Sequence, residues 1–173
     1  MSDPSNALEI EQYAPLHVVA VDSPVGTLWV ESDGTCITRL SFDALPARPA
    51  PVPGLLDEAR HQLAAYFAQH LKKFDLPVQR TGPPFQNLVW GMLEGIPVGS
   101  STTYQSLADR IGNKAIARMV GNACAHNPTP IIVPCHRVLS SNGSLTGYIG
   151  GLWRKRWLLQ HEGVFARDLF EKA

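Results

Sequence analysis

The feature that most constrains the fold is a change of hydrophobic spacing at Thr81-Gly82-Pro83-Pro84. Before this tetrapeptide, short β-branched runs alternate with turn signals, and after it apolar residues recur at helical spacing. Glycine and proline interrupt regular structure, so the tetrapeptide separates two halves. We therefore expect an α+β protein. We divide it into an N-terminal domain over residues 1–81, with a structural role, and a C-terminal domain over residues 82–173.

The first half predicts a small antiparallel sheet. Runs at residues 16–21, 27–32 and 36–42 are rich in β-branched and aromatic residues. Turn signals at Ser23-Pro24-Val25-Gly26 and Asp33-Gly34-Thr35 separate them. This pattern is typical of a three-stranded β-meander.

A proline-rich connector follows the predicted sheet, with Pro46, Pro49, Pro51 and Pro53. Apolar residues at helical spacing then predict a helix over residues 55–71. Residues 74–78 are expected to add one short strand, and the first dozen residues of the chain read as a loose terminus.

The second half predicts four helices, at residues 85–93, 104–111, 114–125 and 152–162. Gly112-Asn113 forms a tight turn between the middle two. Two short helices around a glycine-containing turn match the helix-turn-helix pattern, although an ordinary αα-hairpin has the same signature.

The formal net charge of zero hides an uneven distribution. The first 83 residues carry six basic and ten acidic side chains, and the remainder carries nine and five. The halves therefore differ in sign, −4 against +4. Any contact with a polyanion is expected in the second half, unless the segregation is chance.

Cysteine usage and hydropathy argue against disulfide-rich, zinc-binding, membrane-spanning and secreted proteins. Cys36, Cys124 and Cys135 are an odd number without paired spacing, which predicts no disulfide framework and a reducing compartment. No CxxC or HxxxH spacing suggests zinc, so we expect no metal and no cofactor. No apolar run approaches the roughly 18 residues of a membrane span, and no secretory signal is visible. We expect a cytoplasmic location, or a nuclear one in a eukaryote.

Pro134-Cys135-His136-Arg137 is the candidate for chemistry. The apolar residues 130–133 before it read as a buried extended segment that delivers one thiol. A free thiol has a pKa of roughly 8.5, which a neighbouring imidazole or guanidinium lowers. A Cys-His pair alone is more often a packing or surface feature, so the assignment depends on its surroundings.

Those surroundings resemble a known family. Ile131 to Val138 resembles the signature of the O6-alkylguanine-DNA alkyltransferases. Further motifs occur in family order: Gly82-Pro83-Pro84-Phe85-Gln86, Val89-Trp90, Ile96-Pro97, Thr103-Tyr104, Ala117-Arg118-Met119-Val120-Gly121, Asn127-Pro128, Gly147-Tyr148-Ile149-Gly150-Gly151 and Trp157-Leu158-Leu159-Gln160-His161-Glu162-Gly163. The resemblance is strong over residues 82–163 and weak before them, mainly through residues 23–28.

The resemblance implies a reaction and its catalytic residues. Cys135 is the acceptor that takes the alkyl group from O6-alkylguanine in double-stranded DNA. His136 draws the thiol proton through a water molecule, and Glu162 orients the imidazole. Transfer is irreversible and happens once per molecule, because the thioether is inert. Without the motif, Glu162 would read as a helix-end charge.

The resemblance also implies how the damaged base is reached. Enzymes that act on a base extrude it from the duplex. The helix-turn-helix over residues 104–125 approaches the minor groove, and Arg118 fills the vacated stack. Outside the motif, Arg118 would read as a solvated helix residue. The protein is expected to be a monomer in solution that can assemble cooperatively on DNA.

Four residues are implied in the base pocket. Tyr104 hydrogen-bonds the base, Tyr148 lines the pocket or packs in the core, and the backbone N–H of Ile149 donates. The carbonyl of Val138, with that of Cys135, reads the guanine amino group.

Outside the base pocket, Asn127 resembles the hinge that ties the recognition helix to the cysteine segment, although a simple Asn-Pro turn is the alternative. Lys114, Met119 and Ala125-His126 depart from the family pattern on the DNA-facing helix. These departures put affinity and lesion preference in doubt more than the chemistry.

Two other functions fit parts of the sequence. Alkyltransferase-like proteins bind the lesion without reacting, but they replace the acceptor cysteine, usually with tryptophan. A cysteine hydrolase would need an oxyanion site, for which no local signature is present.

Overall fold

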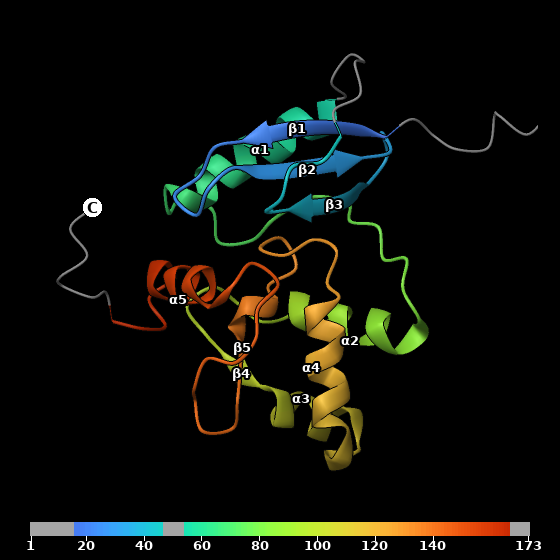
Figure 1. Cartoon of the computed structure of the whole chain (residues 1–173), viewed down its shortest axis with the longest axis vertical. Coiled ribbons are helices and arrows are strands. Elements are labelled where there is room, and N and C mark those ends of the chain that lie inside the picture. The colour runs from blue at the N-terminus through green and yellow to red at the C-terminus, as the bar shows by residue number, and fades with distance from the viewer. Residues whose placement is uncertain (1–15, 47–53, 167–173) are drawn as a thin grey trace, which may run out of the picture.

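An antiparallel sheet of three short strands forms the upper layer of the molecule (Figure 1). The strands are β1 (His17–Val21), β2 (Leu28–Ser32) and β3 (Ile37–Ser41), in the order β1-β2-β3. The predicted meander is therefore confirmed. The computed structural model describes residues 16–46 and 54–166. The predicted loose terminus and most of the proline-rich connector lie outside these ranges.

Helix α1 (Gly54–Phe67) covers one face of the sheet. The strand register pairs Val19 with Val30, and both side chains are buried with Leu63 of the helix. The helix ends four residues before the predicted Leu71. Gln69 adopts a left-handed φ of 62°, and the N–H of His70 bonds back to the Ala65 carbonyl, a geometry that terminates helices.

The predicted strand at residues 74–78 is wrong. Only an isolated bridge joins Val78 to Ile37. The Pro77 carbonyl accepts from Ile37 N–H at 2.7 Å, and Gln79 N–H returns a bond to Ile37 at 2.9 Å. Proline has no N–H to donate, so the ladder does not extend.

The lower layer in Figure 1 is helical. It contains α2 (Pro84–Glu94), α3 (Tyr104–Ile111), α4 (Ala117–Ala125) and α5 (Leu152–His161). Helix α3 has the predicted bounds, because Thr103 caps its start and Gly112, at a φ of 95°, ends it. The predicted helix from Lys114 begins instead as a 3₁₀ turn, Lys114–Ile116, which leads into α4.

Two contacts join the elements of this layer. A parallel pair that the sequence did not predict joins β4 (Thr102–Thr103) to β5 (Val138–Leu139). Trp90 of α2 donates its indole N–H to the Ala123 carbonyl of α4 at 2.8 Å, deep in the helical core.

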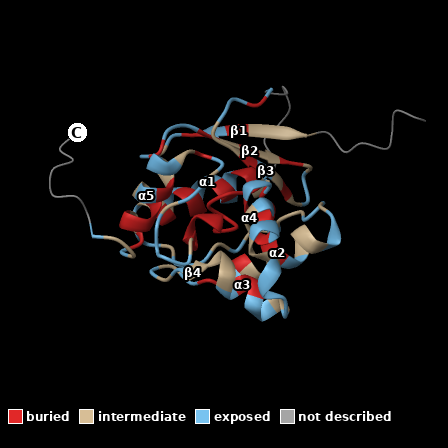
Figure 2. Cartoon of the chain, turned by 60° about the horizontal axis from the view of Figure 1, so that its bottom comes forward, coloured by how far each residue is buried: buried red, intermediate tan, exposed pale blue. Residues whose placement is uncertain are grey.

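Residues 130–139 are all buried where the two layers meet, and Figure 2 shows buried residues gathered in the middle of the molecule. The predicted extended run at residues 130–133 is wrong. This run forms a turn in which Ile131 has a φ of 74° and Val133 N–H bonds to the Thr129 carbonyl. The turn places Ile131 in the hydrophobic core under the β-sheet and α1. It places Val133 in the hydrophobic core between α2, α3 and α4.

Several contacts fix one layer against the other. Leu40 N–H donates to the Pro128 carbonyl at 2.9 Å. Arg154 of α5 donates to the Val25 carbonyl at 2.7 Å and lies over the ring of Phe42. None of the helices in residues 16–46 and 54–166 is long and apolar enough to cross a membrane.

Candidate active site

Cys135 opens a single 3₁₀ turn, Cys135–Arg137, directly after the buried turn at residues 130–133. Its side chain faces a cavity of about 180 Å³ between the helix-turn-helix and the loop before α5. This cavity is lined by Tyr104, Gly121, Cys124, Ala125, Cys135, Gly147, Tyr148 and Ile149. Four residues singled out from the sequence therefore lie around one hollow.

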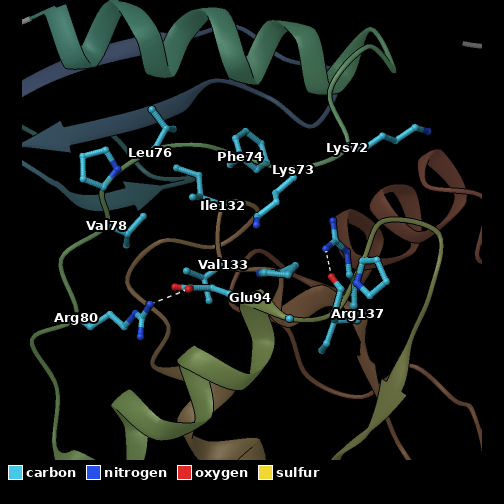
Figure 3. A pocket seen from close by; sticks show the side chains of 15 residues that line it. Lys72, Lys73, Phe74, Leu76, Val78, Arg80, Glu94, Ile132, Val133 and Arg137 are labelled. Carbon is cyan, nitrogen blue, oxygen red and sulfur yellow. Dashed lines mark hydrogen bonds and ion pairs between the residues drawn. The ribbon is translucent and has the colours of Figure 1, made fainter.

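A second hollow is lined in part by the residues before and after Cys135 (Figure 3). It has a volume of about 520 Å³, and an exposed ion pair between Arg80 and Glu94 at 2.7 Å crosses its edge. Pro134 and Arg137 reach its wall, but Cys135 does not. It therefore gives no access to the thiol, and the smaller cavity is the candidate reaction site.

Glu162 collects the charged groups behind Cys135. Its Oε1 accepts from Nε2 of His136 at 2.9 Å, and Arg137 donates to both carboxylate oxygens at 2.8 Å. The remaining guanidinium nitrogen of Arg137 donates to the Ile96 carbonyl. The phenol of Tyr66 also donates to Oε1, at 2.7 Å. All these side chains are buried.

The surroundings leave Glu162 charged and His136 neutral. Burial alone would raise the pKa of Glu162, but hydrogen bonds from His136 and Arg137 outweigh it and hold this pKa far below its ordinary value. Burial lowers the pKa of His136, and the bond to Glu162 only partly opposes that. At neutral pH the pair is therefore an ionised carboxylate beside a neutral imidazole.

The thiol is held in its protonated form. Burial raises the pKa of Cys135 to about 11, against weaker lowering effects from Asn127 and Lys155. The expectation that His136 and Arg137 would lower this pKa is wrong, because both side chains are turned toward Glu162. A base must therefore remove the proton before the sulfur can attack.

The two ring nitrogens of His136 have different surroundings. Its Nε2 is bonded to Glu162, while Nδ1 is buried without a protein partner among the described residues. The hydroxyl of Tyr148 is also buried without a protein partner among the described residues. The rings of His136 and Tyr148 pack edge to face, with 6.5 Å between their centroids. Two polar atoms of this kind are the partners that one bridging water needs.

Lys155 is a buried charged residue beside the cavity that the sequence analysis did not single out. Its side chain is fully buried, and its ammonium donates to the Tyr104 hydroxyl at 3.3 Å and to the Thr146 carbonyl at 3.1 Å. The signal was its spacing, because Lys155 lies three and four residues before buried Leu158 and Leu159 and so shares their face.

Of the other residues predicted in the base pocket, Tyr104 and Ile149 line the cavity and Val138 does not. Tyr104 bonds the Thr146 carbonyl at 3.2 Å, and burial raises its pKa to about 12, so its phenol stays protonated. Ile149 is about half exposed at the rim, with 51% of its surface accessible. Val138 lies in β5, outside the residues that line the cavity.

Asn127 ties the end of α4 to the cysteine segment. Its side-chain N–H donates to the Val133 carbonyl at 2.7 Å, and its oxygen accepts from Thr129 N–H at 3.0 Å. Arg118 lies at the opposite end of α4 and is exposed. It precedes the cavity residue Gly121 by three positions, about 4.5 Å along a helix axis.

The described residues contain no group of three or more histidines, cysteines or acidic residues that could hold a metal ion. The side chains that line the cavity include two thiols, Cys124 and Cys135, and two phenols, Tyr104 and Tyr148.

Comparison with known proteins places both halves in one family. Residues 84–164 match the model of the 6-O-methylguanine DNA methyltransferase DNA-binding domain. Residues 16–79 match the ribonuclease-like domain of the same methyltransferases.

Individual relatives agree with these matches. A methylated-DNA–protein-cysteine methyltransferase of Methanosarcina acetivorans is 51% identical over 155 residues, which cover 86% of this chain and 99% of the relative. One of Mycobacterium bovis is 43% identical over 152 residues, covering 85% and 92%.

Solved structures share the fold. A crystal structure of Mycobacterium tuberculosis O6-methylguanine methyltransferase superposes with a TM-score of 0.78 at 42% identity, covering 88% of this chain and 96% of that one. A structure of Mycobacterium tuberculosis OGT in complex with DNA gives a TM-score of 0.78 at 44% identity, covering 85% and 92%.

The position of Lys155 predicts a change in thiol reactivity. Lys155→Met removes the positive charge and keeps the length of the side chain, so the pKa of Cys135 should rise further. Between pH 7 and 9 the thiolate fraction, and with it the rate of Cys135 alkylation by iodoacetamide, should fall on the order of tenfold. Arg156→Met, a loss of the same charge from an exposed position on α5, should leave the rate close to that of the unchanged protein. An unchanged or faster rate in Lys155→Met would contradict the electrostatic role of the lysine.

Proposed function

The chain belongs to the 6-O-methylguanine DNA methyltransferase family, and on that basis we propose that it repairs O6-alkylguanine in DNA by moving the alkyl group onto its own Cys135. It acts as a methylated-DNA–protein-cysteine methyltransferase. The observation that carries the residue assignment is the cavity of about 180 Å³ that places Cys135 among Tyr104, Tyr148 and Ile149.

The transfer begins with removal of the thiol proton. Because the pKa of Cys135 is about 11, the sulfur is a thiol at neutral pH. His136 takes the proton at Nδ1 through a water molecule, and Glu162 fixes the ring through Nε2. The imidazolium that forms is stabilised by the carboxylate next to it.

The sulfur then displaces the guanine from the alkyl carbon. A sulfur–carbon bond forms and the carbon–O6 bond breaks. The electron pair leaves on the guanine, and the proton that came from the thiol ends on it. The hydroxyl of Tyr104 accepts from Lys155 and donates to the Thr146 carbonyl, so it must turn from that carbonyl toward the guanine to meet the developing negative charge. The atoms balance without a cofactor, and the thioether is inert, so each molecule reacts once.

The lesion must leave the duplex to reach the sulfur. Only 3% of the surface of Cys135 is accessible. A base that is still stacked in the duplex cannot approach the sulfur of so buried a residue. Helix α4 carries cavity residues at one end and the exposed Arg118 at the other. We assign Arg118 to the space that the extruded base vacates, where a flat cation can bond the orphaned partner base.

The remaining assignments rest on the family resemblance. The backbone of Ile149 at the rim and the carbonyls of Val138 and Cys135 are proposed to contact the guanine, with Asn127 as the hinge between α4 and the cysteine segment. Residues 82–173 form the DNA-binding and active-site domain, and residues 1–81 support it. The partner is double-stranded DNA containing the lesion, bound by a cytoplasmic monomer that can assemble cooperatively.

The cysteine at position 135 argues against a non-reacting lesion binder, in which this residue is replaced. A hydrolase would need an acyl-binding oxyanion site, for which the sequence carries no local signature.

Cys135→Ser tests the acceptor directly. The variant should bind O6-methylguanine duplex as well as the unchanged protein does, since the cavity shape is kept, but it should gain no mass. Intact-mass measurement after incubation with that duplex should show one added methyl in the unchanged protein. Peptide mapping should place the methyl on Cys135 rather than on the neighbouring Cys124. Cys36→Ser, outside the cavity, is the control that should still gain it. Methylation of Cys135→Ser at an appreciable rate would exclude Cys135 as the acceptor.

Arg118→Ala separates base extrusion from chemistry. Extrusion costs a few kcal/mol, so loss of its support should slow repair of duplex on the order of tenfold or more. The reaction with free O6-benzylguanine, which needs no extrusion, should change far less. Arg110→Ala removes the same charge from α3 and should affect both reactions alike. Equal slowing of both substrates by Arg118→Ala would remove the base-flipping role.

A further inference from the structure

A tyrosine of the N-terminal half touches the catalytic carboxylate. Tyr66 lies in the last turn of α1, and its hydroxyl donates to Oε1 of Glu162 at 2.7 Å across 96 residues of sequence. Only 2% of its surface is accessible. The half of the chain that was expected to play only a structural role therefore reaches the reaction site through one polar atom.

The phenol is a fixed donor. Its ring packs against Phe74 at 5.4 Å and His161 at 5.3 Å. Burial, with the charge of Glu162 adding to it, raises the pKa of Tyr66 well above its ordinary value, so the proton stays on the oxygen. The hydroxyl can only donate to the ionised carboxylate.

This bond is not needed to neutralise Glu162. Arg137 already gives the carboxylate a full countercharge through bonds to both oxygens. The phenol is directed specifically at Oε1, the same oxygen that binds Nε2 of His136. A donor on that oxygen fixes its position and withdraws negative charge from the contact with the imidazole.

We propose that Tyr66 is a positioning residue for the alkyl transfer: it holds Glu162 Oε1 against His136 and tunes how readily His136 accepts the thiol proton. The inference rests on the proposed function and adds a role for the N-terminal half in it. Tyr66 touches neither Cys135 nor the lesion cavity, so it acts through Glu162.

The charged and titratable groups around Glu162 fix the direction of the effect. They are Tyr66 from α1, His136 and Arg137 from the 3₁₀ turn, and Tyr148 from the loop before α5. The charges of Arg137 and of Lys155 of α5 lower the pKa of His136. If the phenol is removed, Oε1 carries more negative charge and stabilises the imidazolium. The pKa of His136 should then rise, so a larger fraction of His136 should be protonated at a given pH.

The test is the pH dependence of single-turnover transfer from O6-methylguanine duplex by the full chain. The acid limb of the profile reports the loss of neutral His136. In Tyr66→Phe this limb should move to higher pH by about one unit, the equivalent of one hydrogen bond to a charged group. In a Glu162→Gln background the same change should produce no further shift, because the charged oxygen is gone.

Two comparisons separate tuning from packing. Phe74→Leu disturbs the ring against which Tyr66 packs but keeps the phenol, and its acid limb should match that of the unchanged protein. Replacing Tyr66 by 3-fluorotyrosine makes the phenol a stronger donor and should move the limb to lower pH. A structural role alone cannot produce shifts of opposite sign, and the fluorinated protein keeps the test valid if Tyr66→Phe folds poorly.

An acid limb at the same pH in the unchanged, phenylalanine and fluorotyrosine proteins would overturn this inference, provided that all three become methylated on Cys135. If the unchanged protein gains no methyl at all, the proposed function itself fails. The two failures are therefore distinguishable in one experiment.

Discussion

The structure depends on one buried negative charge. An ionised carboxylate inside a protein is strongly unfavourable unless it is paired and hydrogen-bonded. Glu162 satisfies this condition with donors from two distant parts of the chain, Tyr66 of α1 and the His136-Arg137 pair of the 3₁₀ turn. Removal of any partner leaves the charge less compensated, so the positions of these segments are coupled.

This coupling joins elements that are each short. Strands β4 and β5 have two residues each, and the turn that carries Cys135 has three. Such elements have little stability of their own. They are held by the buried contacts around them, with Asn127 tying the cysteine segment to α4 and Arg154 tying α5 to the β-sheet half.

The same arrangement separates two tasks that a reactive thiol requires. Burial keeps Cys135 protonated and so protects it from unspecific reaction, while His136, the proposed base, is neutral. The sulfur then becomes a nucleophile only when its proton has a place to go. A group with a strongly shifted pKa in a cavity is typical of a functional site.

Local signals in the sequence predicted much of the fold. The predicted bounds of α3 were right because Thr103 and Gly112 cap the helix. The predicted β-meander was right because Pro-Val-Gly and Asp-Gly sequences form the turns between its strands. The family resemblance named Cys135, His136, Glu162 and Arg118, whose roles remain predictions. The errors are of a different kind, because they depend on tertiary contacts. The turn at Ile131, the pair β4–β5 and the buried ammonium of Lys155 exist only once distant segments meet.

The sequence also could not reveal which groups face which. His136 and Arg137 adjoin Cys135 along the chain, yet both side chains turn toward Glu162, and Tyr66 joins them from the other half. Carbon-13 NMR of the full chain labelled at the glutamate carboxyl carbon, with the Glu162 signal assigned by its loss in Glu162→Gln, tests this directly. The account predicts that this carboxyl stays ionised as the pH falls through its ordinary pKa of 4.5, for as long as the protein remains folded. A titration of Glu162 near 4.5 in the folded protein would contradict it.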